Sequence, residues 1–142
     1  MLKIDGYTPP DAATATETGI ECKYTTNYGE FVFQTKSSGS VNTDFQKAAE
    51  KLANRRAIQA KTGYKPSTTE SLQDTLAVWH DHVIISWSTT VTAEGKPIAP
   101  TKENFVELFS MEMFLGVFSQ LAADAADLSL FAKEVEAEAA KN

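Results

Sequence analysis

The chain has 142 residues, enough for one domain with a hydrophobic core, and its 42% hydrophobic and 23% charged residues are ordinary values for a globular protein. The net charge of −6 argues against nucleic acid as a partner, because the phosphate backbone is bound by clustered cations. No apolar run approaches the roughly 18–20 residues that span a bilayer, and the single cysteine, Cys22, cannot form an internal disulfide, so we expect neither a membrane segment nor a disulfide-stabilised fold.

Residues 1–18 are rich in threonine, alanine and proline and carry few apolar side chains. This composition predicts a flexible N-terminal arm, with at most a short strand at Leu2–Ile4. The first residues lack the apolar stretch of a signal peptide. We expect a single globular domain to begin at residue 19 and to extend to residue 135.

Two segments with period-two alternation follow the arm and are separated by turn residues. The turn is Asn27-Tyr28-Gly29-Glu30, and the alternating apolar positions are Ile20, Cys22, Tyr24, Phe31 and Phe33. Alternation on both sides of an Asn/Gly turn is typical of an antiparallel β-hairpin.

A first helix is predicted over residues 44–62. Thr43 and Gln46 have the spacing of a capping box at its start, and Gly63 is suited to end it. The helix has a modest apolar stripe, formed by Phe45, Ala49, Leu52 and Ala53.

A second helix is predicted after Ser67, which forms a capping box with Glu70. Its apolar face has the spacing i, i+4, i+7 and i+11, formed by Leu72, Leu76, Trp79 and Val83. The segment from Val83 to Ile85 favours a strand, whereas Trp87 continues the helical stripe. We favour a helix that extends at least through Val83 and ends near Ser86.

The remaining chain contains a polar connector and further helices. Thr89–Pro100 includes a Glu94-Gly95 turn, and Thr101 is the expected cap of a third helix. A fourth helical stretch follows with an unusually wide apolar face, formed by Phe109, Met111, Met113, Leu115, Val117, Phe118, Leu121 and Ala122. Asp124 and Asp127 interrupt this face, Leu128, Phe131 and Val135 continue at helical spacing, and residues 136–142 read as a fraying tail.

The predicted fold class is α+β and mainly helical, with an N-terminal antiparallel β-hairpin packed on a bundle of about four helices. No segment of the sequence repeats another.

His80-Asp81-His82 is the one histidine cluster and the strongest candidate for metal chemistry. On a helix, side chains two positions apart point in different directions and do not share one ion. No nucleophile motif and no phosphate-binding glycine loop accompany this cluster. We therefore expect no catalytic residues, no metal ligands and no cofactor, and the chain is predicted not to be an enzyme.

Two other groups of residues are candidates for partner binding. Lys47, Lys51 and Arg55 stand four residues apart and form a basic stripe that suits an acidic partner, although solvated helix faces often look the same. The second group is rich in methionine and phenylalanine, and such side chains serve in adaptable interfaces as well as in ordinary cores; it consists of Phe109, Met111, Met113, Phe114 and Phe118.

The order of these features resembles the tail assembly chaperones of long-tailed, siphovirus-type bacteriophages. The resemblance covers roughly residues 30–135 and is carried by hydrophobic order and turn chemistry. Its features are Phe31-Val32-Phe33, the helix opening Asn42–Lys47, the segment from Trp79 to Trp87, the turn Glu94-Gly95-Lys96-Pro97 and the helix opening Thr101–Phe105.

The resemblance implies a non-catalytic protein that binds the phage tape measure protein and keeps it soluble during tail assembly. It further implies residence in the host bacterial cytoplasm, absence from the mature virion, and a homo-oligomer. Such chaperones often have a longer form, made by a −1 ribosomal frameshift, whose extension recruits the tail tube protein. Ala140-Lys141-Asn142 can be encoded with a slippery heptamer, which fits this expectation.

Two alternatives from other classes stay open at this point. The first is a structural virion protein, such as a head–tail joining or tail component. The second is a small metal-dependent enzyme that uses His80 and His82.

Overall fold

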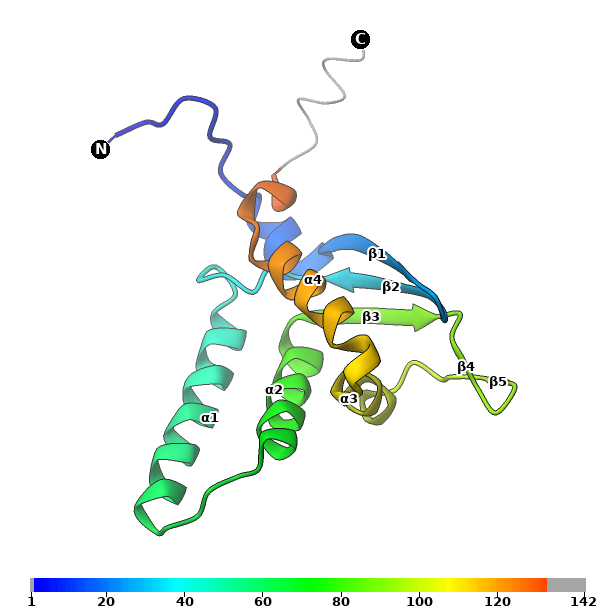
Figure 1. Cartoon of the computed structure of the whole chain (residues 1–142). Helices are drawn as coiled ribbons and strands as arrows, with labels where there is room; N and C mark the ends of the chain where they lie inside the picture. The colour runs from blue at the N-terminus through cyan, green and yellow to red at the C-terminus, as the bar shows by residue number, and fades with distance from the viewer. Residues whose placement is uncertain (1, 133–142) are drawn as a thin grey trace.

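The computed structural model describes residues 2–132, and Figure 1 shows their arrangement. The strands form a three-stranded antiparallel sheet in the order β1-β2-β3 and a small two-stranded hairpin; they are β1 (Ile20–Thr26), β2 (Gly29–Thr35), β3 (Ile84–Thr89), β4 (Thr92–Ala93) and β5 (Lys96–Pro97). The longer helices are α1 (Thr43–Lys61), α2 (Thr68–His82), α3 (Lys102–Ser110) and α4 (Leu115–Ala126). Three short helical turns complete the described chain: η1 (Thr14–Thr18), η2 (Glu112–Phe114) and η3 (Leu128–Phe131).

The α+β, mainly helical fold class is confirmed, and so is the N-terminal hairpin. β1 pairs with β2 in the predicted alternation, with Cys22 opposite Phe33 and Tyr24 opposite Phe31. The side chains of these four residues lie on the buried face of the sheet. The predicted Glu94-Gly95 turn is also present, and both of its residues have positive φ, as a tight hairpin between β4 and β5 requires.

The predicted helix through Val83 to about Ser86 is wrong. α2 ends at His82, and β3 begins at Ile84 and pairs with β2, which places Trp87 opposite Phe33. Val83 itself is fully buried at the junction, and its carbonyl accepts a hydrogen bond from Lys36 N at 2.8 Å. Pairing with β2 satisfies the backbone hydrogen-bonding groups of this segment. Its β-branched side chains also favour a strand, because they would lose rotamer freedom in a helix.

The start of α1 differs from the sequence prediction by one residue. Asn42, not Thr43, is the N-cap, and its Oδ1 accepts from Phe45 N at 3.1 Å. Asn42 is buried, and its Nδ2 donates to the carbonyls of Ser37 at 2.8 Å and His82 at 2.9 Å. One amide side chain therefore joins the start of α1 to the end of α2 and to the loop after β2.

The other predicted helix ends agree with the structure. Ser67 Oγ accepts from Glu70 N at 3.1 Å, and Thr101 Oγ1 accepts from Asn104 N at 3.1 Å. Gly63 has φ +83°, and the chain there makes the paired hydrogen bonds of a glycine-terminated helix, from Gly63 N to Ala60 O and from Tyr64 N to Gln59 O.

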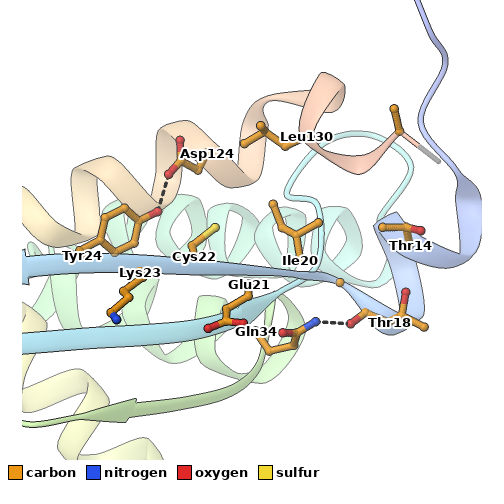
Figure 2. Close-up of a pocket in the computed structure, with 12 residues that line it drawn as sticks. Thr14, Thr18, Ile20, Glu21, Cys22, Lys23, Tyr24, Gln34, Asp124 and Leu130 are labelled. Carbon is orange, nitrogen blue, oxygen red and sulfur yellow. Dashed lines mark hydrogen bonds between the residues drawn. The ribbon is translucent and has the colours of Figure 1, made fainter. Parts of the chain in front are cut away.

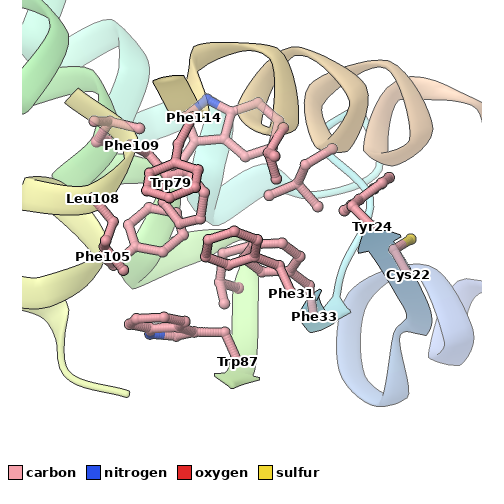
Figure 3. Packing of buried hydrophobic residues seen from close by; sticks show 14 of the residues in the cluster. Cys22, Tyr24, Phe31, Phe33, Trp79, Trp87, Phe105, Leu108, Phe109 and Phe114 are labelled. Carbon is pink, nitrogen blue, oxygen red and sulfur yellow. The ribbon is translucent and has the colours of Figure 1, made fainter. Parts of the chain in front are cut away.

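The hydrophobic core lies between the sheet and the helices α3 and α4, as Figure 3 shows. Phe31 and Phe33 from β2 face Phe105 and Phe109 from α3, and all four side chains are fully buried. Their ring centroids lie 4.9–6.3 Å apart, with Phe105 and Phe109 the closest pair. Trp87 from β3 packs edge-on against the two rings of α3.

The wide apolar face predicted from Met111 onward is divided by a break in the helix. Met111 has extended backbone (ψ 135°), and α3 and the helical segment after it are bent by 95°. As a result Phe114, Val117, Leu121 and Ala125 face the core, whereas Met111, Met113 and Leu115 are exposed.

α1 lies at the periphery and packs against α2 (Figure 1). The two helices form an antiparallel hairpin that projects away from the sheet. All nineteen residues of α1 are described, and none of them is fully buried. The predicted stripe on α1 is real but shallow, and it faces α2.

Part of the segment that the sequence predicts as an arm contacts the domain. Ala15 in η1 is fully buried and accepts a hydrogen bond from Ser37 N at 2.8 Å, and Asp11 N donates to Phe131 O at 2.8 Å. Residues 2–4 form no strand. Val135, the predicted tail 136–142 and the Ala140-Lys141-Asn142 end lie outside the described residues.

Within residues 2–132, no single helix has the length and apolar content needed to cross a membrane. Lys102–Ser110 and Glu112–Ala126 pass that test only when taken together, across the 95° bend.

Candidate functional site

The candidate site is a cleft between α1 and α2, here called the hairpin groove. It has a volume of about 350 Å³ and is lined by Phe45, Ala49, Leu52, Ala53, Arg56, Ser71, Thr75, Val78 and Trp79. Its walls are mostly apolar. Small residues on α1, Ala49 and Ala53, leave room between the helices where larger side chains would fill it. The groove therefore exposes apolar surface beside the main core, and Trp79 contributes to both.

Aromatic side chains from three helices meet at one end of the groove. The ring centroids of Phe45 and Trp79 lie 5.3 Å apart, and those of Trp79 and Phe118 are also 5.3 Å apart, each pair edge-to-face. Trp79 is buried, whereas Phe45 and Phe118 are half-buried. Edge-to-face packing of this kind holds aromatic rings in defined positions, so the end of the groove is a preformed surface rather than a set of loose side chains.

The side chain of Arg56 forms the polar rim of the groove. Arg56 donates to Ser71 Oγ at 2.6 Å and to Asp74 Oδ2 at 3.0 Å, and Arg55 approaches the same carboxylate at 3.4 Å. These bonds link α1 to α2 and fix the separation of the two helices.

The predicted basic stripe lies on the other side of the contact between α1 and α2. A second cleft there, of about 450 Å³, is lined by Lys51 and Arg55 together with Asp74, Asp81 and His82. Lys47 is exposed farther toward the start of α1. Lys47 and Lys51 form no ion pair with another residue in 2–132, whereas Arg55 is already next to Asp74.

The predicted methionine and phenylalanine group is not brought together on one surface. Phe109 and Phe114 are in the core, with 0% and 2% of their surface exposed. Met111 and Met113 are exposed at 38% and 57%, beside the break between α3 and α4. Phe118 alone of the five contacts Trp79 at the groove. The linear spacing was misleading here because the bend at Met111 resets the helical phase.

The histidine cluster occupies the last turn of α2. His80 packs against Phe105 with a centroid distance of 5.4 Å, and Asp81 accepts from Lys102 Nζ at 2.7 Å. Burial opposes the charged form of Asp81, but the hydrogen bonds from Lys102 and His80 outweigh it, so the pKa of this carboxyl is lowered. Among residues 2–132, no group of three or more His, Cys, Asp or Glu side chains is placed to hold a metal ion.

A polar pair that sequence reasoning missed lies beside β1, as Figure 2 shows. Tyr24 donates from its hydroxyl to Asp124 Oδ2 at 2.6 Å, although the two residues are 100 positions apart. Burial, and then the hydrogen bond to Asp124, raise the pKa of the Tyr24 phenol well above its ordinary value, and burial raises the pKa of the neighbouring Cys22 thiol. The position of Asp124 inside an apolar helical stripe suggested a buried polar contact, but nothing in the sequence identifies Tyr24 as its partner.

The residues of the hairpin groove were also missed as a site. The feature of the sequence that pointed to these residues was the weak apolar stripe of α1, and such a stripe is typical of a helix face buried in the core. It becomes a candidate binding surface only because no residue of that helix is fully buried.

Comparison with known proteins gives one match. Residues 37–142 match the model of a family described as YdaY prophage protein, so the matched region starts two residues after the end of β2 and covers most of the chain. No curated protein and no solved structure matches the chain.

Proposed function

This chain belongs to the YdaY prophage protein family and is phage-derived, and from that origin we propose that it is a tail assembly chaperone. In this role it is not an enzyme. It binds the tape measure protein of the phage and keeps that protein soluble while the tail is assembled. The sequence features that resemble tail assembly chaperones, over roughly residues 30–135, overlap the region matched by the prophage family.

The observation that carries the proposal is the hairpin groove. A client rich in amphipathic helix presents apolar side chains at i, i+3 or i+4, and i+7, and a groove between two helices accepts them one by one. About 350 Å³ provides space for a few such side chains rather than for a whole helix. At the aromatic end, Phe45 and Trp79 line the groove and Phe118 packs against Trp79, which gives a defined pocket wall at which one client side chain anchors.

Charge supports a client with acidic positions on the flank of its apolar stripe. Lys47 and Lys51 lie on α1 on the side of the α1–α2 contact opposite the groove, where Lys51 lines the second cleft, and neither has an ion pair within residues 2–132. Exposed cations at the border of an apolar contact speed association and select the orientation of the client, more than they add affinity. Arg55 has a smaller part in this, because Asp74 already lies 3.4 Å away.

The proposal includes the other properties that the resemblance implies. The protein acts in the host bacterial cytoplasm and is absent from the finished virion. It forms a homo-oligomer and needs neither nucleic acid, membrane nor cofactor. A frameshifted form that extends beyond Asn142 recruits the tail tube protein.

The test is co-expression with the tape measure protein encoded by the same prophage. Wild-type chain is expected to keep the tape measure protein in the soluble fraction and to co-purify with it. Leu52→Glu places a charge inside the groove and is expected to abolish both effects, because a carboxylate cannot be buried against an apolar helix. Ile58→Glu is the matched control, since Ile58 is on the same helix, is 64% exposed and does not line the groove.

Circular dichroism of both variants checks that they fold. If folded Leu52→Glu protein solubilises the tape measure protein as well as wild type does, the groove is not the client site. If wild-type chain neither binds nor solubilises it, the chaperone role itself is wrong.

Mass analysis of purified particles separates this role from a structural one. A chaperone is missing from finished virions, whereas a head–tail joining or tail component is present in many copies. Detection of this chain in purified particles at a stoichiometric level would therefore replace the chaperone by the structural alternative.

A further inference from the structure

β1 is an edge strand with backbone groups that point away from the sheet. The sheet order is β1-β2-β3, and no other strand within residues 2–132 pairs on the outer side of β1. Glu30 O accepts from Thr90 N at 3.0 Å and from Thr89 Oγ1, so the backbone of Glu30 faces β3. Along a strand, the N–H and C=O groups of successive residues point alternately to one neighbouring strand and to the other.

This alternation decides which groups of β1 are free. Since Glu30 faces β3, its neighbour Phe31 faces β1 and exchanges hydrogen bonds with Tyr24, its partner in the register. The backbone groups of Glu21, Lys23 and Thr25 consequently point outward. None of them has a hydrogen-bond partner among residues 2–132.

A cleft of about 970 Å³ runs beside this edge, and Figure 2 shows side chains that line it. Its lining includes Glu21, Cys22 and Lys23 from β1 and Leu130 from the segment after α4. Leu130 is 43% exposed. An exposed leucine next to unpaired strand groups is the combination that a docking partner would cover.

We propose that a second copy of this chain docks at this edge, with its β1 antiparallel to the first, so that the two three-stranded sheets become one of six strands. The occupant is identified by charge complementarity within β1 itself. In an antiparallel pair, residues with outward backbone groups must lie opposite one another. This restricts the symmetric registers to those in which each odd-numbered residue of β1, such as Glu21 or Lys23, lies opposite another odd-numbered residue.

Of these registers, one opposes unlike charges. Centring the dyad on Cys22 places Glu21 opposite the partner's Lys23, and by symmetry Lys23 opposite the partner's Glu21. Centring it on Glu21 opposes two glutamates, and centring it on Lys23 opposes two lysines. Like charges directly opposite destabilise a strand pair and unlike charges stabilise it, so the register centred on Cys22 is selected.

Lysine on an edge strand usually discourages pairing with other chains. Here the residue two positions before it supplies the neutralising charge across the dyad. The present partner of Lys23 is Glu30, at 3.4 Å with both side chains largely exposed, and a pair of this kind contributes little and does not compete strongly.

The register has a second measurable consequence. Cys22 lies opposite the partner's Cys22 as a non-hydrogen-bonded pair, with Cα atoms about 4.5 Å apart, within the range of about 4.4–6.8 Å that a disulfide spans. Prolonged oxidation with diamide, which takes up the two thiol hydrogens as it is reduced to the hydrazine, is expected to link two chains through Cys22, and to do so slowly because the thiol is buried and its pKa is raised.

The main experiment is a charge swap read by sedimentation equilibrium of the full chain at micromolar concentrations. Wild type is expected to be a dimer. Glu21→Lys and Lys23→Glu each replace both unlike pairs by like pairs and are expected to weaken the dimer at least about tenfold. The double variant, Glu21→Lys with Lys23→Glu, restores two unlike pairs and is expected to recover the dimer.

Lys23→Pro is a second variant, which removes the outward N–H of residue 23 and leaves the β1–β2 hydrogen bonds in place. This variant is expected to be a folded monomer. Thr25→Lys, a charge added outside the two Glu–Lys pairs, is the matched control and is expected to stay dimeric.

A monomeric wild type overturns the proposal. If removal of residues 133–142 then produces a dimer, the edge is covered by the chain's own C-terminal segment instead. A dimer that none of the β1 variants weakens places the interface elsewhere. The groove variant Leu52→Glu is expected to keep the dimer, so failure of the chaperone role and failure of this interface are distinguished.

Discussion

The aromatic side chains are buried to different extents in the two halves of this molecule. In the sheet with α3 and α4, Phe31, Phe33, Phe105 and Phe109 have no exposed surface and pack against one another on several sides. In the hairpin of α1 and α2, no residue of α1 is fully buried, and Phe45 is half-buried against Trp79.

The difference indicates that the sheet with α3 and α4 contributes more to the stability of the domain than α1 does. A helix that buries little contributes little to the stability of the domain, so its apolar side chains can stay accessible without loss of the core. Trp79 from α2 joins the two halves, because it belongs to the core cluster, contacts Phe118 from α4 and also lines the hairpin groove.

Phe109→Ala is expected to destabilise the protein by about 3–5 kcal/mol, because it removes a fully buried ring that four other core aromatics contact. Urea unfolding followed by tryptophan fluorescence measures the loss. Phe45→Ala, the matched change in the hairpin half, is expected to cost less than half as much. Equal losses at the two positions would mean that α1 is part of the core after all.

Asn42→Ala is expected to cost about 2–3 kcal/mol, since it removes an N-cap and leaves two buried carbonyls, those of Ser37 and His82, without their donor. The same urea titration measures it. Thr43→Ala tests the cap expected from the sequence and should change the free energy of unfolding by less than about 0.5 kcal/mol. The reverse order of these two effects would show that Thr43 caps α1 in solution.

The raised pKa of Tyr24 is expected to make the free energy of unfolding fall at alkaline pH. Its pKa in the folded protein is raised above the ordinary value of 10.0, so the unfolded chain loses this proton first as the pH rises. Stability from Tyr24 is therefore fully present below pH 10 and is lost above it, at about 1.4 kcal/mol per pH unit.

Unfolding free energies between pH 9.5 and 11.5 test this expectation, with Tyr24→Phe as the control, because other groups titrate in the same range. The wild type should lose stability more steeply than the variant over that interval. Parallel curves would show that the pKa of Tyr24 is not raised in the folded protein.

Met113→Asp is expected to change the free energy of unfolding by less than about 0.5 kcal/mol, because this side chain is 57% exposed. We also expect unchanged binding of the tape measure protein, since Met113 does not line the hairpin groove. Weakened binding in the co-purification assay would instead locate the client site at the break between α3 and α4, as the sequence suggested.

Local features of the fold were predictable because short-range chemistry determines them. Ser67 and Thr101 cap their helices as expected, Gly63 ends α1 with a positive φ, and the alternation around Asn27 and Tyr28 forms the hairpin. In each case the decisive hydrogen bonds join residues only a few positions apart.

The errors have a common cause, which is competition between local patterns and distant partners. The spacing of Trp79, Val83 and Trp87 fits a helix, but β2 supplies hydrogen bonds to Ile84 and the residues after it, and the strand prevails. The Phe109–Phe118 group fits one helical face, but the bend at Met111 sends its members to the core and to the surface.

By itself the sequence determined the fold class, the positions of most turns and caps, and which residues are apolar enough to be buried. Only the tertiary structure decided which apolar residues stay accessible in the hairpin groove, that Asn42 joins α1 to α2, and that Tyr24 meets Asp124. Burial and long-range hydrogen bonds depend on which elements come together in space. The unpaired edge of β1 belongs to the same class, because a strand is an edge only with respect to the sheet that forms around it.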